Sequence, residues 1–589
     1  MFKLLKRLNG REYGMIGISL VFIVAQVWLE LSIPGYMSTI TTKLETAGTT
    51  VSDVLQPGLM MILYSVLSVI AAVITGYFVA KIAGGFTARL RQDVFNQVMD
   101  YSTQDIKKFS VASLLTRTTN DLTQIQQFVA MGLQVIIKAP ITAVWAIYMI
   151  AGKGWQWTTA TAVAVVILCV MLTFILTSVQ PKFKAVQSLT DRLNLVTQEN
   201  LTGIRVVHAF NAEGYQNDKL KQANDDLTTT NKFAYRVLAL MNPGMSLISS
   251  GLTLAVYTIG AVIINAAAGA QRLTLFSNMV VFSSYAMQVI MGFLLLSIIF
   301  ILLPRVTVSA SRVNEVLAIQ PSVKNPDTTA TTPTTTGTLE FKDVSFSYPG
   351  ADQPALSHLS FKATAGQTVA LIGSTGSGKS TALNLIPRLY DATSGQVLLD
   401  GVNVRQYAAN DLNDRLGYIP QKAVLFSGTI QSNLDFGQAP HKSSPLTAAD
   451  ANAALSIAQS KDFVDAEPEQ LAAPVAQHGD NFSGGQKQRL AMARAIARQP
   501  EILLFDDSFS ALDYETDRKL REALATQAAQ TTKIIVAQRI STVLDADEII
   551  VLDEGKVVGQ GTHQDLIKTN PVYQEIAYSQ LSKEELANA

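Results

Sequence analysis

The chain has 589 residues, too many for one ordinary domain, so we expect two or more domains. Hydrophobic residues make up 48% and charged residues only 16%, and the formal net charge of zero gives no electrostatic support to a nucleic-acid partner. The single cysteine, Cys169, excludes an intrachain disulfide and a cysteine-built metal site, and we expect it to be a small buried hydrophobic residue.

The N-terminal half contains apolar stretches long enough to cross a bilayer core, which requires about 20 helical residues. We predict six spans, at 14–37, 58–80, 129–151, 158–178, 244–265 and 278–303. A basic segment precedes the first stretch, as in a signal peptide, but the length of that stretch and the spans that follow favour a membrane anchor. The sequence therefore predicts a transmembrane domain over residues 1–320.

Basic residues concentrate in the second-to-third and fourth-to-fifth connections between the spans. By the positive-inside bias, both long connections and both termini are expected in the cytoplasm. Apolar residues recur in these connections at helical spacing with few helix breakers, so we expect them to be helical extensions of the spans.

Residues 321–337 are rich in Thr and Pro and nearly free of apolar side chains, which predicts a linker. Beyond it, strand-like runs such as 369–373, 501–505, 533–537 and 548–552 alternate with helical ones. This alternation predicts a parallel sheet flanked by helices, so residues 338–589 are expected to be an α/β domain.

A phosphate-binding motif follows the strand 369–372 and precedes a helix expected to begin at Ser380. Its glycines let backbone amides wrap around phosphates, Lys379 reaches the β- and γ-phosphates, and Ser380 is a magnesium ligand. The cofactor-binding residues predicted here are Gly373, Ser374, Thr375, Gly376, Ser377, Gly378, Lys379, Ser380 and Thr381. The alternative, a chance Gly/Ser-rich loop, does not explain the strand and helix on either side.

Two further segments carry chemistry. The strand 502–505 ends in Asp506 and Asp507, and an acidic residue there suits direct or second-shell magnesium binding. The segment Phe482, Ser483, Gly484, Gly485 and Gln486 is followed by a basic helix, and Ser483 is a plausible N-cap. By itself this segment is also consistent with a capped surface helix.

Together these motifs resemble the nucleotide-binding domain of ATP-binding-cassette (ABC) transporters. Ser483 to Gln486 match the signature motif, with Phe482 where leucine is usual, and Ser510 to Asp513 match the D-loop. Tyr348 matches the aromatic residue that stacks on adenine, and Gln421 matches the Q-loop glutamine. The resemblance implies ATP and Mg²⁺ as ligands, with Ser380, Gln421 and Asp506 around the metal.

Six spans and a C-terminal ATPase in one chain resemble a half-transporter of the exporter class. The resemblance implies that each chain carries one P-loop NTPase domain with a helical signature subdomain, and that two such chains dimerise. Each ATP is then held between one chain's phosphate loop and the other chain's signature motif. It also places coupling helices, which transmit closure of the ATPase domains to the spans, near 110–115 and 206–213.

Three positions depart from the family pattern. Asp507 stands where a catalytic glutamate is usual, Gln538 replaces the switch histidine, and Gln477 replaces a glutamate before the signature. Aspartate is one methylene shorter, and a misplacement of about 1 Å can cost about a hundredfold in rate. Glutamine still donates a hydrogen bond but neither titrates nor carries charge. The set resembles the degenerate-site subunit of heterodimeric bacterial multidrug exporters, although a tolerated conservative exchange is the alternative.

We therefore expect an ABC-type transporter ATPase whose own site is slow or impaired in hydrolysis. It would export amphipathic compounds across a bacterial cytoplasmic membrane by alternating access, paired with a second half-transporter that supplies the catalytic Glu and His. A lipid or peptide exporter, and a non-transporting regulator or channel on the same fold, are the alternatives.

Ionisable residues inside predicted spans are functional candidates by default. Lys138 and Glu30 are such residues, but their estimated depths differ by a helical turn or more, so no pairing is expected. Methionine and aromatic residues of the spans could line a tolerant apolar site, or simply pack between helices or face lipid: Met241, Met245, Tyr257, Phe282, Tyr285, Met287, Met291 and Phe293.

Overall fold

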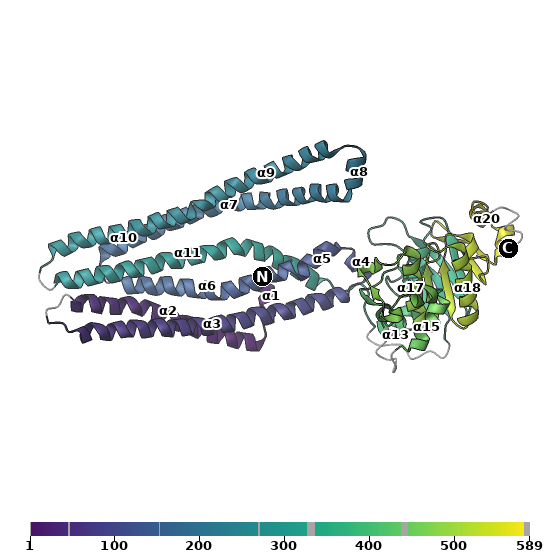
Figure 1. Ribbon diagram of the computed structural model, residues 1–589, viewed down its shortest axis with the longest axis horizontal. Helices are drawn as coiled ribbons and strands as arrows, with labels where there is room; N and C mark the ends of the chain where they lie inside the picture. The colour runs from purple at the N-terminus through teal and green to yellow at the C-terminus, as the bar shows by residue number, and fades with distance from the viewer. Residues whose placement is uncertain are drawn as a thin grey trace. The chain divides into compact units, whose positions relative to one another are not determined.

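The computed structural model describes residues 2–44, 48–151, 153–268, 271–326, 336–437 and 446–581. The chain divides into two compact units, drawn in Figure 1. The first, here called the membrane unit, comprises Met1–Met99 and Val111–Ile319. The second, the cassette unit, comprises Asp100–Ser110 and Gln320–Ala589. Part of the expected linker, 327–335, lies outside the described residues, and the boundaries 320/321 and 337/338 stay a prediction.

The membrane unit is entirely helical in its described part. Six of its helices are long and apolar enough to cross a membrane, which confirms the six predicted spans. They extend well beyond the predicted limits, because the polar connections continue the helical pattern as expected. The elements are α1 (Phe2–Leu5), α2 (Gly10–Leu44), α3 (Val51–Met99), α5 (Val111–Thr118), α6 (Asn120–Ile150), α7 (Trp155–Thr202), α8 (Ile204–Ala209), α9 (Glu213–Ala239), α10 (Met241–Ala266) and α11 (Gln271–Ala318).

Within this unit, α2 packs along α3 and α6 packs along α11 (Figure 1). The α7–α9 pair runs away from α6 and α11 toward the short helix α8. A central apolar cluster joins α2, α6, α7, α10 and α11, and in it the buried Trp157 donates from Nε1 to the Val256 carbonyl over 3.1 Å. Apolar packing with the polar edge of the indole satisfied is what a bilayer interior demands.

Two expectations about the spans are wrong. Cys169 is exposed on α7, because the apolar side chains on the outer faces of a span contact lipid rather than protein. Lys138 and Glu30 do pair, with 2.9 Å between Nζ and Oε1. Counting residues along straight, untilted spans misjudged the depths of these two side chains. Helices tilt, so residues whose numbers suggest different depths lie at the same depth.

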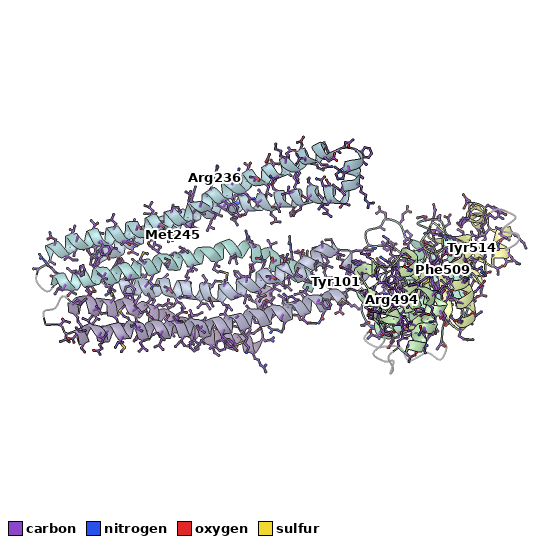
Figure 2. The ribbon with its side chains drawn as sticks, in the orientation of Figure 1. Tyr101, Arg236, Met245, Arg494, Phe509 and Tyr514 are labelled. Carbon is purple, nitrogen blue, oxygen red and sulfur yellow. The ribbon has the colours of Figure 1, made fainter. Side chains whose placement is uncertain are left out.

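The candidate apolar residues differ in burial, and whether any of them lines a substrate site stays a prediction. Met245 (labelled in Figure 2), Phe282 and Tyr285 are buried in the central cluster, so they pack between helices. Tyr257 and Met291 are exposed. The set as a whole therefore does not form one surface.

The cassette unit contains two principal sheets. The larger has strand order β12-β11-β3-β10-β9-β6, in which β11, β3, β10, β9 and β6 are parallel and β12 is antiparallel. The smaller is antiparallel, with order β2-β1-β4-β5. The strands are β1 (Leu339–Phe346), β2 (Leu356–Ala363), β3 (Thr368–Gly373), β4 (Ser394–Leu399), β5 (Val402–Asn403), β6 (Leu416–Ile419), β9 (Ile502–Asp506), β10 (Thr532–Val536), β11 (Glu548–Asp553) and β12 (Lys556–Gly561).

The predicted parallel sheet is confirmed, and its central strands β3, β9 and β10 are buried almost throughout. Because parallel strands share one carboxyl edge, the loops after β3, β9 and β10 meet there. The helices are α12 (Lys379–Leu385), α13 (Ala409–Asp414), α14 (Ile430–Leu434), α15 (Ala448–Ile457), α16 (Lys461–Asp465), α17 (Gly484–Ala497), α18 (Tyr514–Gln527), α19 (His563–Thr569) and α20 (Pro571–Tyr578), with the short pair β7 (Gly428–Thr429) and β8 (Pro474–Val475).

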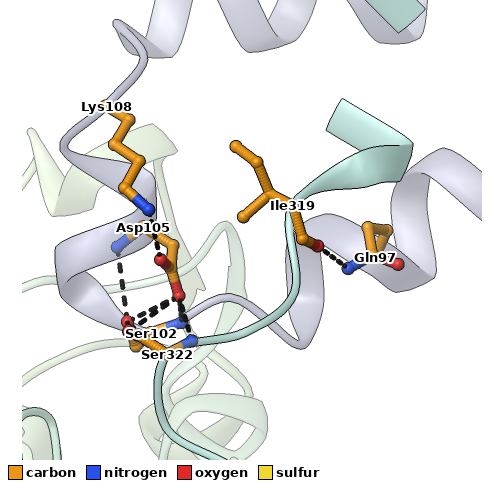
Figure 3. A network of polar contacts seen from close by, with 6 residues as sticks. All are labelled: Gln97, Ser102, Asp105, Lys108, Ile319 and Ser322. Atoms are coloured by element: carbon orange, nitrogen blue, oxygen red, sulfur yellow. Dashed lines mark hydrogen bonds and ion pairs between the residues drawn. The ribbon is translucent and has the colours of Figure 1, made fainter. Parts of the chain in front are cut away.

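The cassette unit also includes the segment 100–110, which contains α4 (Thr103–Ile106). The fully buried Asp105 holds it, accepting hydrogen bonds from Ser322 N (2.8 Å), Ser102 Oγ (2.8 Å) and Lys108 Nζ (3.0 Å), as Figure 3 shows. Burial alone would raise the pKa of Asp105, but these donors outweigh it and hold the pKa well below its ordinary value.

The first predicted coupling segment, near 110–115, covers the boundary between the two units and the start of α5, and its coupling role stays a prediction. The capping box of Ser102 and Asp105 closes the separate short helix α4 before α5 begins. The second predicted segment coincides with α8 and the start of α9.

Candidate nucleotide-binding site

The phosphate loop joins β3 to α12. Gly376 and Gly378 have φ of +86° and +99°, a backbone region that favours glycine. A Cβ at Gly378 would also stand 2.8 Å from the Ala355 carbonyl oxygen, so no larger residue fits there. The helix begins at Lys379, one residue before the predicted start. The loop therefore has the open backbone that a phosphate cradle requires.

Lys379 is held inside this loop. It is 7% exposed, and its Nζ donates to the carbonyl oxygens of Gly373 (2.8 Å) and Ser374 (2.7 Å). Burial lowers the pKa of Lys379, while the charges of Asp507 and Asp506 act in the opposite direction. The Lys379 Nζ also donates to Ser377 Oγ over 3.3 Å, so uncharged oxygens of the loop hold this ammonium where a phosphate can become its counter-charge.

Ser380 and Asp506 lie together where β9 ends beside α12. Ser380 Oγ donates to Asp506 Oδ1 over 2.6 Å, which brings two hard oxygen ligands to one point. Burial raises the pKa of Asp506, and the hydrogen bond from Ser380 partly opposes this. Oxygen ligands beside a phosphate loop fit the preferences of Mg²⁺.

Asp507 lies next to this pair in a left-handed backbone conformation, with φ of +48°. Its Oδ2 accepts hydrogen bonds from Gln538 Nε2 (2.8 Å) and Gln421 Nε2 (3.1 Å). Burial raises the pKa of Asp507, and the hydrogen bond from Gln421 lowers it. Three residues far apart in sequence, each predicted from the sequence, therefore meet at one carboxylate oxygen.

Tyr348 lies in a group of aromatic rings close to the phosphate loop. Its hydroxyl is 3.0 Å from Thr381 Oγ1, and its ring is perpendicular to that of Tyr390 at 5.4 Å. Lys107, from the segment 100–110, places its Nζ 5.5 Å from the Tyr348 ring centroid and 5.6 Å from that of Tyr390. A hydrogen bond to Tyr390 raises the pKa of Lys107.

Sequence reasoning missed several residues around these side chains. Lys107 and Tyr390 carry no motif, and their proximity to Tyr348 depends on tertiary folding. Burial raises the pKa of Tyr418 to about 12, and its hydroxyl lies against Asp506. Ser510 donates to the Asp507 carbonyl over 2.7 Å, and only its place within the D-loop match could have indicated this.

The signature segment forms a separate surface. Ser483 is the N-cap of α17 and makes a capping box with Gln486, as predicted. Phe482 is 7% exposed in the apolar core, which explains why an aromatic residue is accepted where leucine is usual. Asp513 caps α18 by accepting from Thr516 N over 2.9 Å.

In the part of the chain that the structure describes, no hydrogen bond or ion pair joins Ser483–Gln486 to the phosphate loop. The β3–α12 loop, the carboxylates after β9 and the glutamines after β6 and β10 together define a P-loop nucleotide-binding fold carried by a protein with six membrane-spanning helices.

Comparisons with known proteins agree with this class. The family model for the ABC transporter transmembrane region matches residues 16–302, and the ABC transporter model matches residues 356–510. An uncharacterized ABC transporter ATP-binding protein of Mycobacterium tuberculosis is 39% identical over 549 residues, covering 92% of this chain and 93% of that one. YfiB of Bacillus subtilis, with the same description, is 30% identical, covering 98% of each chain.

An ATP-dependent lipid A-core flippase of Pseudomonas fluorescens is 30% identical over 87% of this chain and 84% of that one. The solved structure of a bacterial Atm1-family ABC exporter with ATP bound superposes with a TM-score of 0.78, covering 96% of this chain and 98% of that chain at 24% identity, so the fold is shared. The chain belongs to the ABC transporters: it is an exporter-type polypeptide with an N-terminal transmembrane region and a C-terminal ATPase domain.

Proposed function

We propose that this chain is one subunit of a heterodimeric exporter of amphipathic compounds, and that its own phosphate loop holds ATP with little hydrolysis. The observation that carries the proposal is Asp507. In this family a glutamate at that position polarises the attacking water, and here a shorter carboxylate has one oxygen already engaged by two amide groups.

The two glutamines explain why hydrolysis should be slow. Each donates an N–H to Asp507 Oδ2, so that oxygen is already occupied as an acceptor and is not free to orient a water molecule. Gln538 cannot supply the positive charge that a protonated histidine brings to a γ-phosphate. A base that is shorter and already hydrogen-bonded loses the alignment on which general-base catalysis depends.

Nucleotide binding, in contrast, has its full set of residues. Lys379 is positioned for the β- and γ-phosphates, and Tyr348 offers an aromatic face for adenine. Ser380, Asp506 and Gln421 would hold Mg²⁺, which when bound neutralises phosphate charge. The site therefore keeps the groups that bind and has altered only those that activate water.

The signature segment, which keeps Ser483 to Gln486 and departs from the family pattern at Phe482, supports a role in a second site. Ser483 presents the N-terminus of α17, a helix of sufficient length to carry a dipole, and its glycines expose the backbone amides to an anion. We propose that this surface completes the ATP site of a partner half-transporter that carries the catalytic Glu and His. Both termini would lie in the cytoplasm, and ATP-driven closure of the two cassettes would switch the spans between inward- and outward-facing states.

The test is phosphate release by the full chain alone and together with its partner. We expect the chain alone to bind ATP and hydrolyse it slowly, and the two subunits together to hydrolyse ATP rapidly. Replacing the partner's catalytic glutamate should abolish the rapid hydrolysis. Full hydrolysis by this chain alone would overturn the proposal. A half-transporter with the catalytic Glu and His, encoded next to this gene, would identify the partner.

A lipid exporter is the second candidate, because relatives about as similar to this chain as YfiB are named ATP-dependent lipid A-core flippases. Transport assays in vesicles containing both subunits distinguish these functions. Uphill ATP-dependent movement of a drug or of a labelled lipid identifies the exporter and its cargo, whereas ion flux without an ATP requirement would indicate a channel.

A further inference from the structure

The loop that carries Gln538, here called the switch loop (538–540), lies between two regular segments. One residue past β10, the Ala537 N–H still donates to the Leu371 carbonyl of β3 over 3.1 Å. A short 3₁₀ helix, Ile540–Thr542, then begins at the fully buried Ile540. The Gln538 side chain therefore leaves the backbone where the sheet has ended and the next helix has not yet begun.

One side chain from the C-terminal segment bonds to this loop twice. Gln580 Nε2 donates to the Gln538 carbonyl over 2.8 Å, and Gln580 Oε1 accepts from the Ile540 N–H over 2.9 Å. A single amide group thus satisfies a carbonyl and an N–H two residues apart, as a residue of a neighbouring parallel strand would. It holds the backbone on both sides of Arg539 and, with it, the direction in which the Gln538 side chain starts.

Gln580 is itself anchored. It follows α20, whose Tyr573 and Ala577 are fully buried in the same apolar cluster as Ile540. The Gln580 N–H donates to the Ala577 carbonyl over 3.1 Å, so its backbone continues the last turn of that helix. The amide is therefore carried by a segment fixed to the core, as a group that positions another residue must be.

Arg539 gives the switch loop a second and different connection. Its guanidinium donates to the carbonyls of Ser510 (3.1 Å) and Leu512 (3.3 Å) in the D-loop. A long side chain with many rotamers joins two loops but leaves the backbone of its own residue free to turn. Gln580, in contrast, bonds the backbone directly.

The switch loop ends its reach at the carboxylate after β9. The Asp507 N–H donates to the Val536 carbonyl over 3.0 Å, which fixes the Asp507 backbone to β10. Gln538 Nε2 donates to Asp507 Oδ2 over 2.8 Å. Since the Asp507 backbone is fixed to β10, this contact depends on where the switch loop directs Gln538.

Resting on the proposed function, we propose that Gln580 is a positioning residue for the nucleotide site. Its amide holds the switch loop so that the Gln538 amide stays on the Asp507 carboxylate, and it thereby keeps that oxygen from orienting water. The C-terminal segment then acts on hydrolysis through Gln538 and not on nucleotide binding, because Lys379 and Ser380 lie on another element.

The kinetic test uses the full chain with its partner, the partner's catalytic glutamate being replaced by glutamine so that turnover reports this chain's phosphate loop. We expect Gln580→Ala to raise kcat about fivefold, the equivalent of one neutral hydrogen bond, and to leave the dissociation constant of ATP unchanged. Gln538→Ala should raise kcat at least as much, and adding Gln580→Ala to it should give no further increase. Loss of folding would lower kcat, so it cannot mimic this result.

Gln574→Ala is the matched control. Gln574 Nε2 donates to the Ile567 carbonyl over 2.8 Å, a bond of the same kind on the same helix, and its loss should leave kcat unchanged. A second measurement reports the switch loop without hydrolysis. Hydrogen exchange, followed by mass spectrometry on peptides that contain Ile540, should become faster in Gln580→Ala and stay as in the parent in Gln574→Ala, because Gln580 Oε1 accepts from that N–H.

A joint fall of kcat and ATP affinity in Gln580→Ala would show a purely structural role and overturn the proposal. Additive effects of Gln580→Ala and Gln538→Ala, or an unchanged exchange rate at Ile540, would overturn it as well. If Gln538→Ala raises kcat while Gln580→Ala changes neither kcat nor exchange, the proposed function stands and the positioning role fails. If Gln580→Ala speeds exchange but neither variant raises kcat, Gln580 holds the loop, and occupation of the Asp507 oxygen is not what slows hydrolysis.

Discussion

Replacing Asp507 by glutamate is expected to raise ATP hydrolysis at this chain's own phosphate loop by about a hundredfold. The native Oδ2 is 3.1 Å from Gln421 Nε2 and 2.8 Å from Gln538 Nε2, so both amides hold it back from the position of an attacking water. One more methylene advances the carboxylate by about 1.5 Å, the length of a C–C bond. A hundredfold change corresponds to about 2.7 kcal/mol of activation free energy.

The measurement is phosphate release by the full chain with its partner, in which the partner's own catalytic glutamate is replaced by glutamine. Under these conditions turnover reports the phosphate loop of this chain. Adding Gln538→His to Asp507→Glu should increase the rate further, because a protonatable donor then faces the γ-phosphate. Asp507→Asn should be no faster than the parent, and Lys379→Ala should lose nucleotide binding.

Two outcomes would refute this reasoning. If Asp507→Glu hydrolyses ATP no faster than the parent, the length and hydrogen bonding of this carboxylate do not limit the rate. If the parent chain already turns over as fast as the glutamate variant, the site is not degenerate.

Three further predictions follow from named contacts. Tyr348→Ala should weaken ATP binding about tenfold, the value of one base–aromatic stack, in a fluorescent-nucleotide titration, whereas Tyr348→Phe should not; equal weakening by both would contradict stacking. Gly378→Ala should abolish nucleotide binding, because the added Cβ would clash with the Ala355 carbonyl oxygen. Gly484→Ala, whose added Cβ would meet nothing within 4 Å, should leave the melting temperature unchanged. Asp105→Asn should destabilise the folded chain by about 3 kcal/mol near neutral pH, since it weakens several charge-assisted hydrogen bonds.

The Asp105 prediction has a defined pH dependence. Its pKa is depressed in the folded chain, so the stability that its ionised form contributes is fully present above the ordinary value of 3.8 and is lost as the pH falls below it. Thermal unfolding should therefore show the parent and Asp105→Asn converging at acid pH. The exposed Asp100→Asn serves as the matched control, and a constant gap between parent and Asp105→Asn down to low pH would contradict the assignment.

Much of the nucleotide site could be predicted because its residues lie in contiguous segments with fixed spacing. The strand before Gly373, the glycines at Gly376 and Gly378, and the helix that begins at Lys379 are local features whose backbone preferences are legible in sequence. The same holds for the capping box at Ser483. Family resemblance implied that Asp507 and Gln538 share one site, but the contact of both Gln421 and Gln538 with a single Asp507 oxygen required coordinates.

The membrane unit shows the opposite balance. Apolar length alone predicted six spans, because lipid requires each one to satisfy its own backbone hydrogen bonds. Hydropathy did not predict which side chains meet: the Glu30–Lys138 pair was missed, and Cys169 was expected inside but faces outward. Lys107 likewise carries no motif that would place it over Tyr348.

The departures at Asp507 and Gln538 were recognised from the family resemblance. The sequence by itself determined the number of spans, the α/β ATPase domain and the phosphate loop. Those features depend on composition, periodicity and short-range spacing, which a single chain segment contains. Only the tertiary structure decided that Glu30 meets Lys138, and that Lys107 lies over the aromatic rings. Such contacts depend on how helices tilt and on which residues far apart in the chain are brought together by folding. Local propensity carries no information about either.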